Sequence, residues 1–413
     1  MAETALSTHR FATLQKYRTA GYFTAFVALG LAYASLGPTL TYLAANVGAG
    51  LQHISYSFSA RGLGYLVGSV IGGRSYDLVK GNPFMAAMLV LVAVLLAAIP
   101  MVPVLWLLIG VIFLLGIFEG AIDVGGNTLL IWVHGDEVDP YMNALHFFFG
   151  VGAFLSPIIV AQAIVIGGSV RWAYWVIALL MLPVAGLLLR LSSPAGPGRQ
   201  TKVDRVEGDD ELHGTTGSCP RQDYALVALI AVFFFLYVGV EGTFGGWIAT
   251  YAEATGLGDA ATAAYLTSAF WGALTVGRLL SIPIGARFSP RQVLLGDLTG
   301  CLVSITVLLL WPRVPAATWI GTLGAGLAMA SVFPTTLSLA ERHTTITGTI
   351  TSFFFVGGSI GGMTIPWLIG QLFERVGPQV TTSAMMGAAI LAFLVFGIIV
   401  IHTRSSEKKV AYG

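Results

Sequence analysis

Long apolar stretches separated by short polar breaks recur along the whole chain. A helix of roughly 20 apolar residues is long enough to cross about 30 Å of hydrocarbon. We count twelve such stretches, which predict membrane-spanning helices at 19–46, 55–76, 84–101, 104–132, 142–166, 172–191, 224–251, 261–286, 292–311, 316–340, 347–373 and 380–401. The pattern therefore predicts an all-α membrane protein with twelve transmembrane helices.

One long polar break, 192–222, lies near the middle of the chain and is rich in Ser, Pro, Gly and charged residues. We expect it to be a cytoplasmic linker between an N-terminal six-helix half, 1–191, and a C-terminal six-helix half, 223–413. The halves resemble each other, because Gly30–Tyr42 (GLAYASLGPTLTY) aligns with Gly239–Tyr251 (GVEGTFGGWIATY). Two parallel repeats predict the major facilitator fold, with a substrate site between the halves near the membrane midplane.

Composition and charge agree with this fold class. The 413 residues are 56% apolar and only 10% charged, whereas soluble domains are about 25% charged. Lys and Arg concentrate at the helix ends that face the same side as the N-terminus, while the opposite side holds only Arg171, Arg313 and Arg375. The positive-inside rule then predicts a multi-pass protein of the cell (inner) membrane with both termini in the cytoplasm. Cys219 and Cys301 have no metal-ligand spacing around them and indicate no redox or zinc site.

Three polar residues, Glu119, Asp123 and Asn127, follow one another at intervals of four inside the apolar span 104–132, so they share one helix face. A carboxylate at the bilayer centre costs about 2.5–3.5 kcal/mol, which predicts that this face lines a wet cavity. Two carboxylates one turn apart repel each other if both are ionised. We therefore expect this face to bind a cation, either a proton or a sodium ion with Asp123 and Asn127 as metal ligands.

Other polar and aromatic residues within the spans are candidates for the substrate site: His146, Glu241, Trp247, Trp271 and Arg278, together with Asn127. Aromatic faces with hydrogen-bonding groups suit sugars, whose C–H faces stack on rings while their hydroxyls need polar partners. Two alternatives remain open. Buried charges can pair for structural reasons, Glu241 with Arg278 or Arg61 with a carboxylate of 104–132, and a tryptophan can serve packing alone.

The segment Gly116–Pro157, which contains IDVGGNTLLIW and PYMNALHFFFGVGAFLSP, resembles helices 4 and 5 of the sodium-dependent glucose transporter family within the major facilitator superfamily. Phe235–Ala252 and Ala263–Pro283 are similar to helices 7 and 8 of that family. The resemblance implies cation-coupled or facilitative hexose uptake, with Glu119, Asp123 and Asn127 as the charged motif of helix 4.

A broader similarity to fucose–proton symporters implies a helix 4 glutamate, which Glu119 matches. Those symporters also carry an acid in helix 1, where this chain offers only Asn46, so a two-acid scheme would use Asp123. The superfamily's gating loop is present in degenerate form, with Gly73 and Asp77 retained and Leu78 in place of the basic residue. We expect Asp77 to cap a neighbouring helix and latch one conformation, and we include Arg61 among the gating candidates.

These observations predict a cation-coupled hexose symporter that works by alternating access. No Walker loop or nucleophile elbow occurs, so an enzyme is not expected. The alternatives are a proton-driven exporter of amphipathic compounds and a facilitative sugar uniporter. We expect no cofactor beyond the coupling ion, a monomer in the lipid bilayer, a small sugar as the ligand, and no nucleic acid partner.

Overall fold

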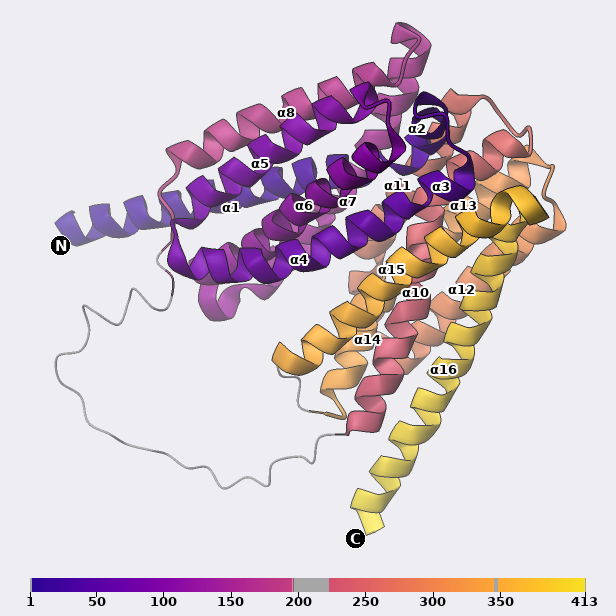
Figure 1. Ribbon diagram of the computed structural model, residues 1–413. Helices are drawn as coiled ribbons and strands as arrows, with labels where there is room; N and C mark the ends of the chain where they lie inside the picture. Colours follow the sequence, from indigo (N-terminus) through magenta and orange to yellow (C-terminus); the bar gives the residue numbers. More distant parts are fainter. Residues whose placement is uncertain (1, 195, 197–222, 345–347, 413) are drawn as a thin grey trace.

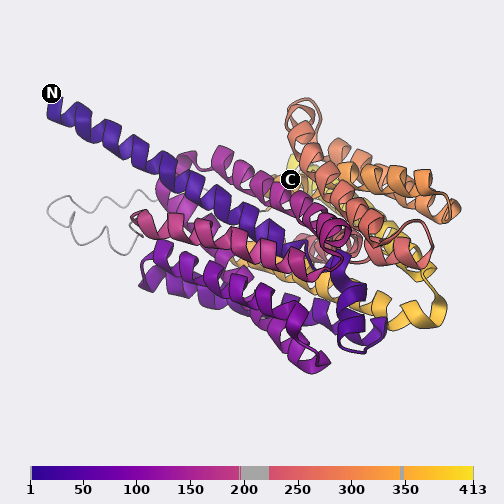
Figure 2. The ribbon, with the colours of Figure 1, turned by 90° about the horizontal axis from the view of Figure 1, so that it is seen from above.

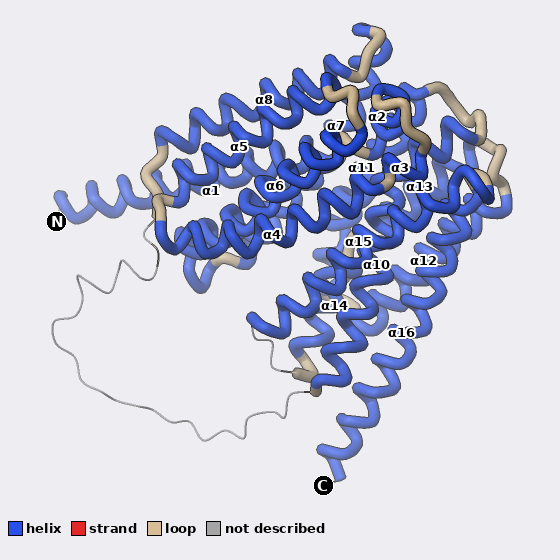
Figure 3. Tube along the Cα trace, viewed as in Figure 1, coloured by secondary structure: helices blue, strands red, loops and turns tan. Residues whose placement is uncertain are grey.

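The computed structural model of the chain describes residues 2–194, 196, 223–344 and 348–412 (Figure 1). The N-terminal half contains α1 (Ala2–Tyr33), η1 (Gly37–Thr39), α2 (Leu40–Asn46), α3 (Leu51–Ile54), α4 (Tyr56–Leu78), α5 (Gly81–Ala98), η2 (Ile99–Met101), α6 (Leu105–His134), η3 (Gly135–Glu137), α7 (Asp139–Gly167) and α8 (Arg171–Arg190). The C-terminal half contains α10 (Tyr224–Ala254), α11 (Ala260–Gly285), α12 (Pro290–Leu310), α13 (Pro315–Met329), α14 (Val332–Glu341), α15 (Gly348–Val376) and α16 (Gln379–Tyr412). The described residues contain no strand (Figure 3).

The helices form two bundles, α1–α8 and α10–α16, which lie side by side in two perpendicular views (Figures 1 and 2). The ribbons of the two bundles meet where α2, α3, α11 and α13 gather, and diverge toward the end that carries both termini. We call the first end the remote end and the second the terminal end. The all-helical fold of two halves that the repeats predicted is confirmed.

Ten helical stretches of the described chain are long and apolar enough to cross a membrane. The predicted spans 55–76 and 261–286 also form helices, α4 and α11, but these fall short of that hydropathy. Both helices pack against the opposite half, α4 on α15 and α11 on α7. Their lower hydropathy therefore fits helices that turn one face to protein of the other half rather than to lipid.

Two predicted spans are interrupted. Span 19–46 is a helix only to Tyr33, after which a turn and the short η1 and α2 redirect the chain at Gly37 and Pro38. Span 316–340 breaks at Ala330 and Ser331, where Pro334 has no N–H to bond the Ala330 carbonyl four residues earlier. Discontinuous membrane helices leave free backbone groups that neighbouring side chains must satisfy.

Glycines set the distance between α4 and α6. A Cβ at Gly64 or Gly68 would collide with the backbone carbonyl of Phe113 or Ile117 on α6. Such close contact between small residues is typical of packing in membrane helices. It brings the polar side chains of α4 directly onto the carboxylates of α6.

Side chains at the remote end join the two halves. Gln371 of α15 donates to the Gln52 carbonyl at 2.9 Å and to Ser55 Oγ at 3.1 Å, and Gln52 Nε2 donates back to Gln371 Oε1 at 3.1 Å. The Leu51 N–H donates to the Glu374 carboxylate at 2.7 Å. We call this group, Leu51, Gln52, Ser55, Gln371 and Glu374, the remote seal.

A second contact between the halves runs along α7 and α11. Gln162 Nε2 donates to Tyr265 Oη at 2.5 Å, and Ser268 Oγ donates to the Phe154 carbonyl at 2.7 Å. Nearer the terminal end, Arg278 Nη1 donates to the His146 carbonyl at 3.1 Å. The halves are therefore held together at the remote end and along one side.

Candidate functional site

The centre of the N-terminal half contains a buried ion pair between Arg61 of α4 and Glu119 of α6. Arg61 Nε and Nη2 donate to the two carboxylate oxygens of Glu119 at 2.8 and 2.5 Å, and the residues are 7% and 1% exposed. The same guanidinium donates to the carbonyls of Ala32 and Tyr33 at 3.0 and 2.8 Å. These carbonyls lie at the end of α1, where the helix stops and leaves its last acceptors without helical partners.

Arg61 was a gating candidate, with structural pairing to a carboxylate of 104–132 as the alternative. The bidentate contact with Glu119 favours the structural role. The charge of Glu119 is already balanced, so the cation that we expected at this residue is not required there. The pair joins α4, α6 and the end of α1. Loss of Arg61 alone would leave the Glu119 charge buried without its partner and would remove a donor from the Tyr33 carbonyl, whereas the Ala32 carbonyl would still accept from Ser35.

Asp123, one turn further along α6, has a different environment. Tyr65 Oη of α4 donates to Asp123 Oδ2 at 2.6 Å, and Asn127 Nδ2 donates to the Asp123 carbonyl at 2.8 Å. No described Lys, Arg or His forms an ion pair with this carboxylate. Asp123 and Asn127 are both half-buried. The face that the sequence predicted thus holds one balanced carboxylate and one carboxylate without a counter-charge.

Aromatic side chains from both halves meet beside the ion pair. The Tyr33 ring lies 4.9 Å from the Arg61 guanidinium carbon and contacts Phe149 and Trp271, with ring centroids 5.6 and 5.9 Å apart. Trp271 of α11 is buried, and its indole N–H has no hydrogen-bond partner among the residues that the structure describes. An unpaired buried donor costs about 1–3 kcal/mol, so a ligand acceptor at this position would be stabilised.

The other predicted tryptophan, Trp247, is held by packing. Its indole N–H donates to the Pro366 carbonyl at 2.9 Å, and its ring stacks on Phe373 at 5.2 Å. It also contacts Phe58 of the opposite half at 5.9 Å. Trp247 therefore has a packing role, because it joins α10 to α15 and to α4 of the opposite half.

His146, Glu241 and Arg278 lie where α7, α10 and α11 face one another. The His146 side chain is exposed and lies edge-on to Phe26 at 5.9 Å. Glu241 is half-buried beside Tyr237. The structure describes both Glu241 and Arg278 and forms no direct ion pair between them in this conformation, although the two charges interact electrostatically.

The gating residues Gly73 and Asp77 lie in the last turns of α4, at the terminal end. Asp77 is exposed, and the next helix, α5, has Lys80 at its N-cap and no side-chain cap. The expected capping bond is thus absent from this conformation. The halves are apart at this end, so a latch from Asp77 to the opposite half stays a prediction for the other conformation.

Three further polar residues were not predicted from the sequence. Tyr33 and Tyr65 contact the charged residues described above, and Tyr65 lies one turn from Arg61 on the same face of α4, a spacing that could have indicated it. Asp297 of α12 accepts a hydrogen bond from Ser331 Oγ at 2.5 Å, at the break between α13 and α14. The sequence could have indicated Asp297, because an acidic residue inside a predicted membrane span is a candidate for a functional role.

Comparison with known proteins agrees with this arrangement. The model of the Major Facilitator Superfamily matches residues 22–366. Sodium-dependent glucose transporter 1 of Homo sapiens is 31% identical over 407 residues, which cover 91% of this chain and 77% of that protein. Sodium-dependent glucose transporter 1A of Mus musculus is 31% identical over 409 residues, which cover 91% and 94%. The crystal structure of the nucleoside transporter NupG matches with a TM-score of 0.69 at 14% identity, covering 94% of this chain and 98% of that one, which is a likeness of fold alone.

The two-bundle fold and the polar site between its halves define a membrane transporter, not an enzyme, and the chain belongs to the Major Facilitator Superfamily. Within that superfamily it belongs to the sodium-dependent glucose transporter family. The resemblance to this family that the sequence indicated is confirmed.

Proposed function

We propose that the protein is a cation-coupled hexose symporter that works by alternating access. The observation that carries the proposal is Asp123, a half-buried carboxylate inside a membrane helix that has no cationic partner in the described chain. Two relatives that match most of the chain are named sodium-dependent glucose transporters, which supports a sugar as the substrate.

Asp123 is the proposed site of the coupling cation. An isolated carboxylate at membrane depth is costly, so the loaded form, with a proton or a sodium ion, is favoured over the empty one. Sodium, as a hard cation, takes oxygen ligands, which Asp123 and Asn127 can supply. Tyr65 of α4 donates a hydrogen bond to the Asp123 carboxylate of α6. Binding of a cation to Asp123 would therefore alter a contact between these two helices.

The sugar site lies between the halves, beside Asp123. Tyr33 and Trp271 offer ring faces from α1 and α11, and the free Trp271 N–H offers a donor to a hydroxyl. Asn127, His146, Glu241 and Arg278 supply further hydrogen-bonding groups around this space. A ligand that touches both halves can couple its own binding to their relative movement.

The remote seal joins the halves at the remote end, and their ribbons diverge toward the terminal end (Figure 1), from which we infer a conformation that opens at the terminal end. With both termini in the cytoplasm of a cell membrane, as the distribution of Lys and Arg predicts, this is the inward-facing state. Rocking of the halves about the α7–α11 contact would open the remote seal and close the terminal end. Asp77 would then come close enough to the opposite half to form the contact that stabilises the outward-facing state.

Uptake into proteoliposomes tests this proposal. Radiolabelled D-glucose, D-galactose, D-mannose and L-fucose are offered under an inward sodium gradient, an inward proton gradient, or neither. Accumulation of a hexose above its external concentration under one of the gradients supports symport. Equilibration without accumulation would indicate the uniporter, and absence of hexose entry under every condition would overturn the sugar assignment.

A further inference from the structure

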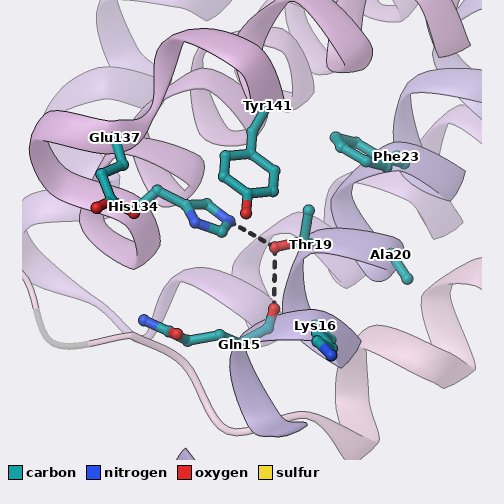
Figure 4. A pocket seen from close by; sticks show the side chains of 8 residues that line it. All are labelled: Gln15, Lys16, Thr19, Ala20, Phe23, His134, Glu137 and Tyr141. Atoms are coloured by element: carbon teal, nitrogen blue, oxygen red, sulfur yellow. Dashed lines mark hydrogen bonds between the residues drawn. The ribbon is translucent and has the colours of Figure 1, made fainter. Parts of the chain in front are cut away.

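A cavity of about 330 Å³ lies at the terminal end of the N-terminal half (Figure 4), and neither Asp123 nor Asn127 lines it. It lies between residues 15–23 of α1 and the turn that joins α6 to α7. Its walls include Lys16, Thr19 and Phe23 from α1, and His134, Glu137 and Tyr141 from the turn and its flanking helices. The cavity is open on one side and so is accessible from the terminal end.

Hydrogen bonds fix one wall of this cavity. The Thr19 hydroxyl lies 2.9 Å from the Gln15 carbonyl, to which it can donate, and forms a hydrogen bond of 2.7 Å with His134 Nε2. This hydrogen bond orients the His134 imidazole on the cavity wall. Its ring stacks on Tyr141 with centroids 3.5 Å apart and planes 13° apart, which holds the tyrosine ring against the wall.

The remaining polar groups are available to a ligand. Lys16 and Glu137 are exposed, and the structure, which describes both, forms no ion pair between them. One positive and one negative group on the same cavity favour an uncharged ligand with both donors and acceptors over an ion of either sign. The rings of Tyr141 and Phe23 add apolar faces. A polyhydroxylated ring offers hydroxyls to the charged groups and C–H faces to the aromatic rings.

The cavity adjoins the central site. Phe23, which lines it, stacks on Phe148 of α7 with centroids 4.9 Å apart, and Phe26, one turn further along α1, contacts His146. Tyr141 and His146 are five residues apart on α7, a rise of about 7.5 Å. Ala20 and Thr24 are exposed on the same stretch of α1. A molecule that leaves the central site toward the terminal end passes this cavity.

We propose that this cavity is a release site, a second and weaker binding site that a hexose occupies between the central site and the aqueous phase. The proposal rests on the proposed function and adds a second location for the same ligand. Tyr141 provides the stacking face, and Glu137 and Lys16 bind hydroxyls.

Protection of a cysteine from labelling tests the release site. In a chain with Cys219→Ser and Cys301→Ala, Ala20→Cys places one thiol on the cavity, for reaction with a membrane-impermeant maleimide. The probe is whichever D-hexose the same preparation transports, with L-glucose as the control. Because the labelling rate follows the unoccupied fraction, a sugar at four times its Kd slows labelling about fivefold.

Protection could also come from closure of the terminal end when the central site is filled. The variants Tyr141→Ala and Glu137→Gln separate the two causes, with Tyr17→Ala, an exposed aromatic on α1 outside the cavity, as the matched control. The release site predicts that Tyr141→Ala and Glu137→Gln weaken protection and that Tyr17→Ala does not. Protection that persists in both cavity variants, or hexose uptake without any protection, overturns the release site alone. Absence of both uptake and protection for every hexose overturns the transport proposal with it.

Discussion

At the residue scale, the buried pair of Arg61 and Glu119 is expected to matter for stability. Glu119→Ala leaves the Arg61 charge buried and uncompensated, which costs about 3–5 kcal/mol. The double variant Arg61→Met with Glu119→Leu removes both charges and should cost less than the single change. Thermal unfolding in detergent measures both. A double variant at least as unstable as Glu119→Ala would contradict the structural role.

The same residues show what the sequence can and cannot predict at this scale. Spacing alone placed Glu119, Asp123 and Asn127 on one face, because helical periodicity is local. Spacing offered Arg61 as a partner but could not decide which carboxylate it pairs with or that Tyr65 binds the other. Arg61 and Tyr65 come from another helix, whose register on α6 depends on where the glycines of both helices allow contact. Whether a carboxylate on this face has a counter-charge is therefore determined by tertiary packing and not by the local sequence.

At the element scale, the contact of α4 with α6 gives a second prediction. Gly68→Ala puts a methyl group against the Ile117 carbonyl and should destabilise the protein by about 1–3 kcal/mol. Gly110→Ala on α6 is the matched control, because nothing lies within 4 Å of its added Cβ. The control should be neutral or stabilising by about 0.5–1 kcal/mol, as alanine is the better helix former. Equal unfolding temperatures for the two variants would show that the close contact is not required.

Helix number was predictable because hydropathy reports lipid exposure, but helix breaks were not. The apolar pattern continues through Gly37 and Pro38 and through Pro334, so the spans 19–46 and 316–340 looked uninterrupted. The breaks are stabilised by side chains of other helices. Arg61 satisfies the end of α1, and Asp297 binds Ser331 at the start of α14.

At the scale of the whole molecule, the remote seal is expected to set the balance between conformations. Gln371→Ala removes three hydrogen bonds between the halves, each contributing about 0.5–1.5 kcal/mol, so the state open at the remote end should gain about tenfold or more in population. Spin labels at the exposed positions His53 and Arg375 report the distance across the seal. Arg313→Ala, exposed at the same end, is the control. An unchanged distance distribution in Gln371→Ala would contradict the role of the seal.

The internal repeat was enough to predict a fold of two halves, and the substrate site between them stays a prediction. The repeat could not indicate the conformation, because the inward-facing and outward-facing states expose the same lipid-facing residues and satisfy the same hydropathy pattern. The conformation depends on a few polar contacts between the halves, such as Gln52 with Gln371, which leave no periodic signal in the sequence.

The central claim is that Asp123 binds the cation that drives hexose accumulation. The most direct measurement compares gradient-driven accumulation with counterflow, the exchange of labelled for unlabelled hexose, in proteoliposomes of wild type, Asp123→Asn and the exposed control Glu341→Gln. Removing the negative charge should abolish accumulation, because no cation is bound, while counterflow, which needs only the sugar site and the movement of the halves, continues. The control should match wild type in both assays. Accumulation by Asp123→Asn at the wild-type level would contradict the assignment of the coupling site.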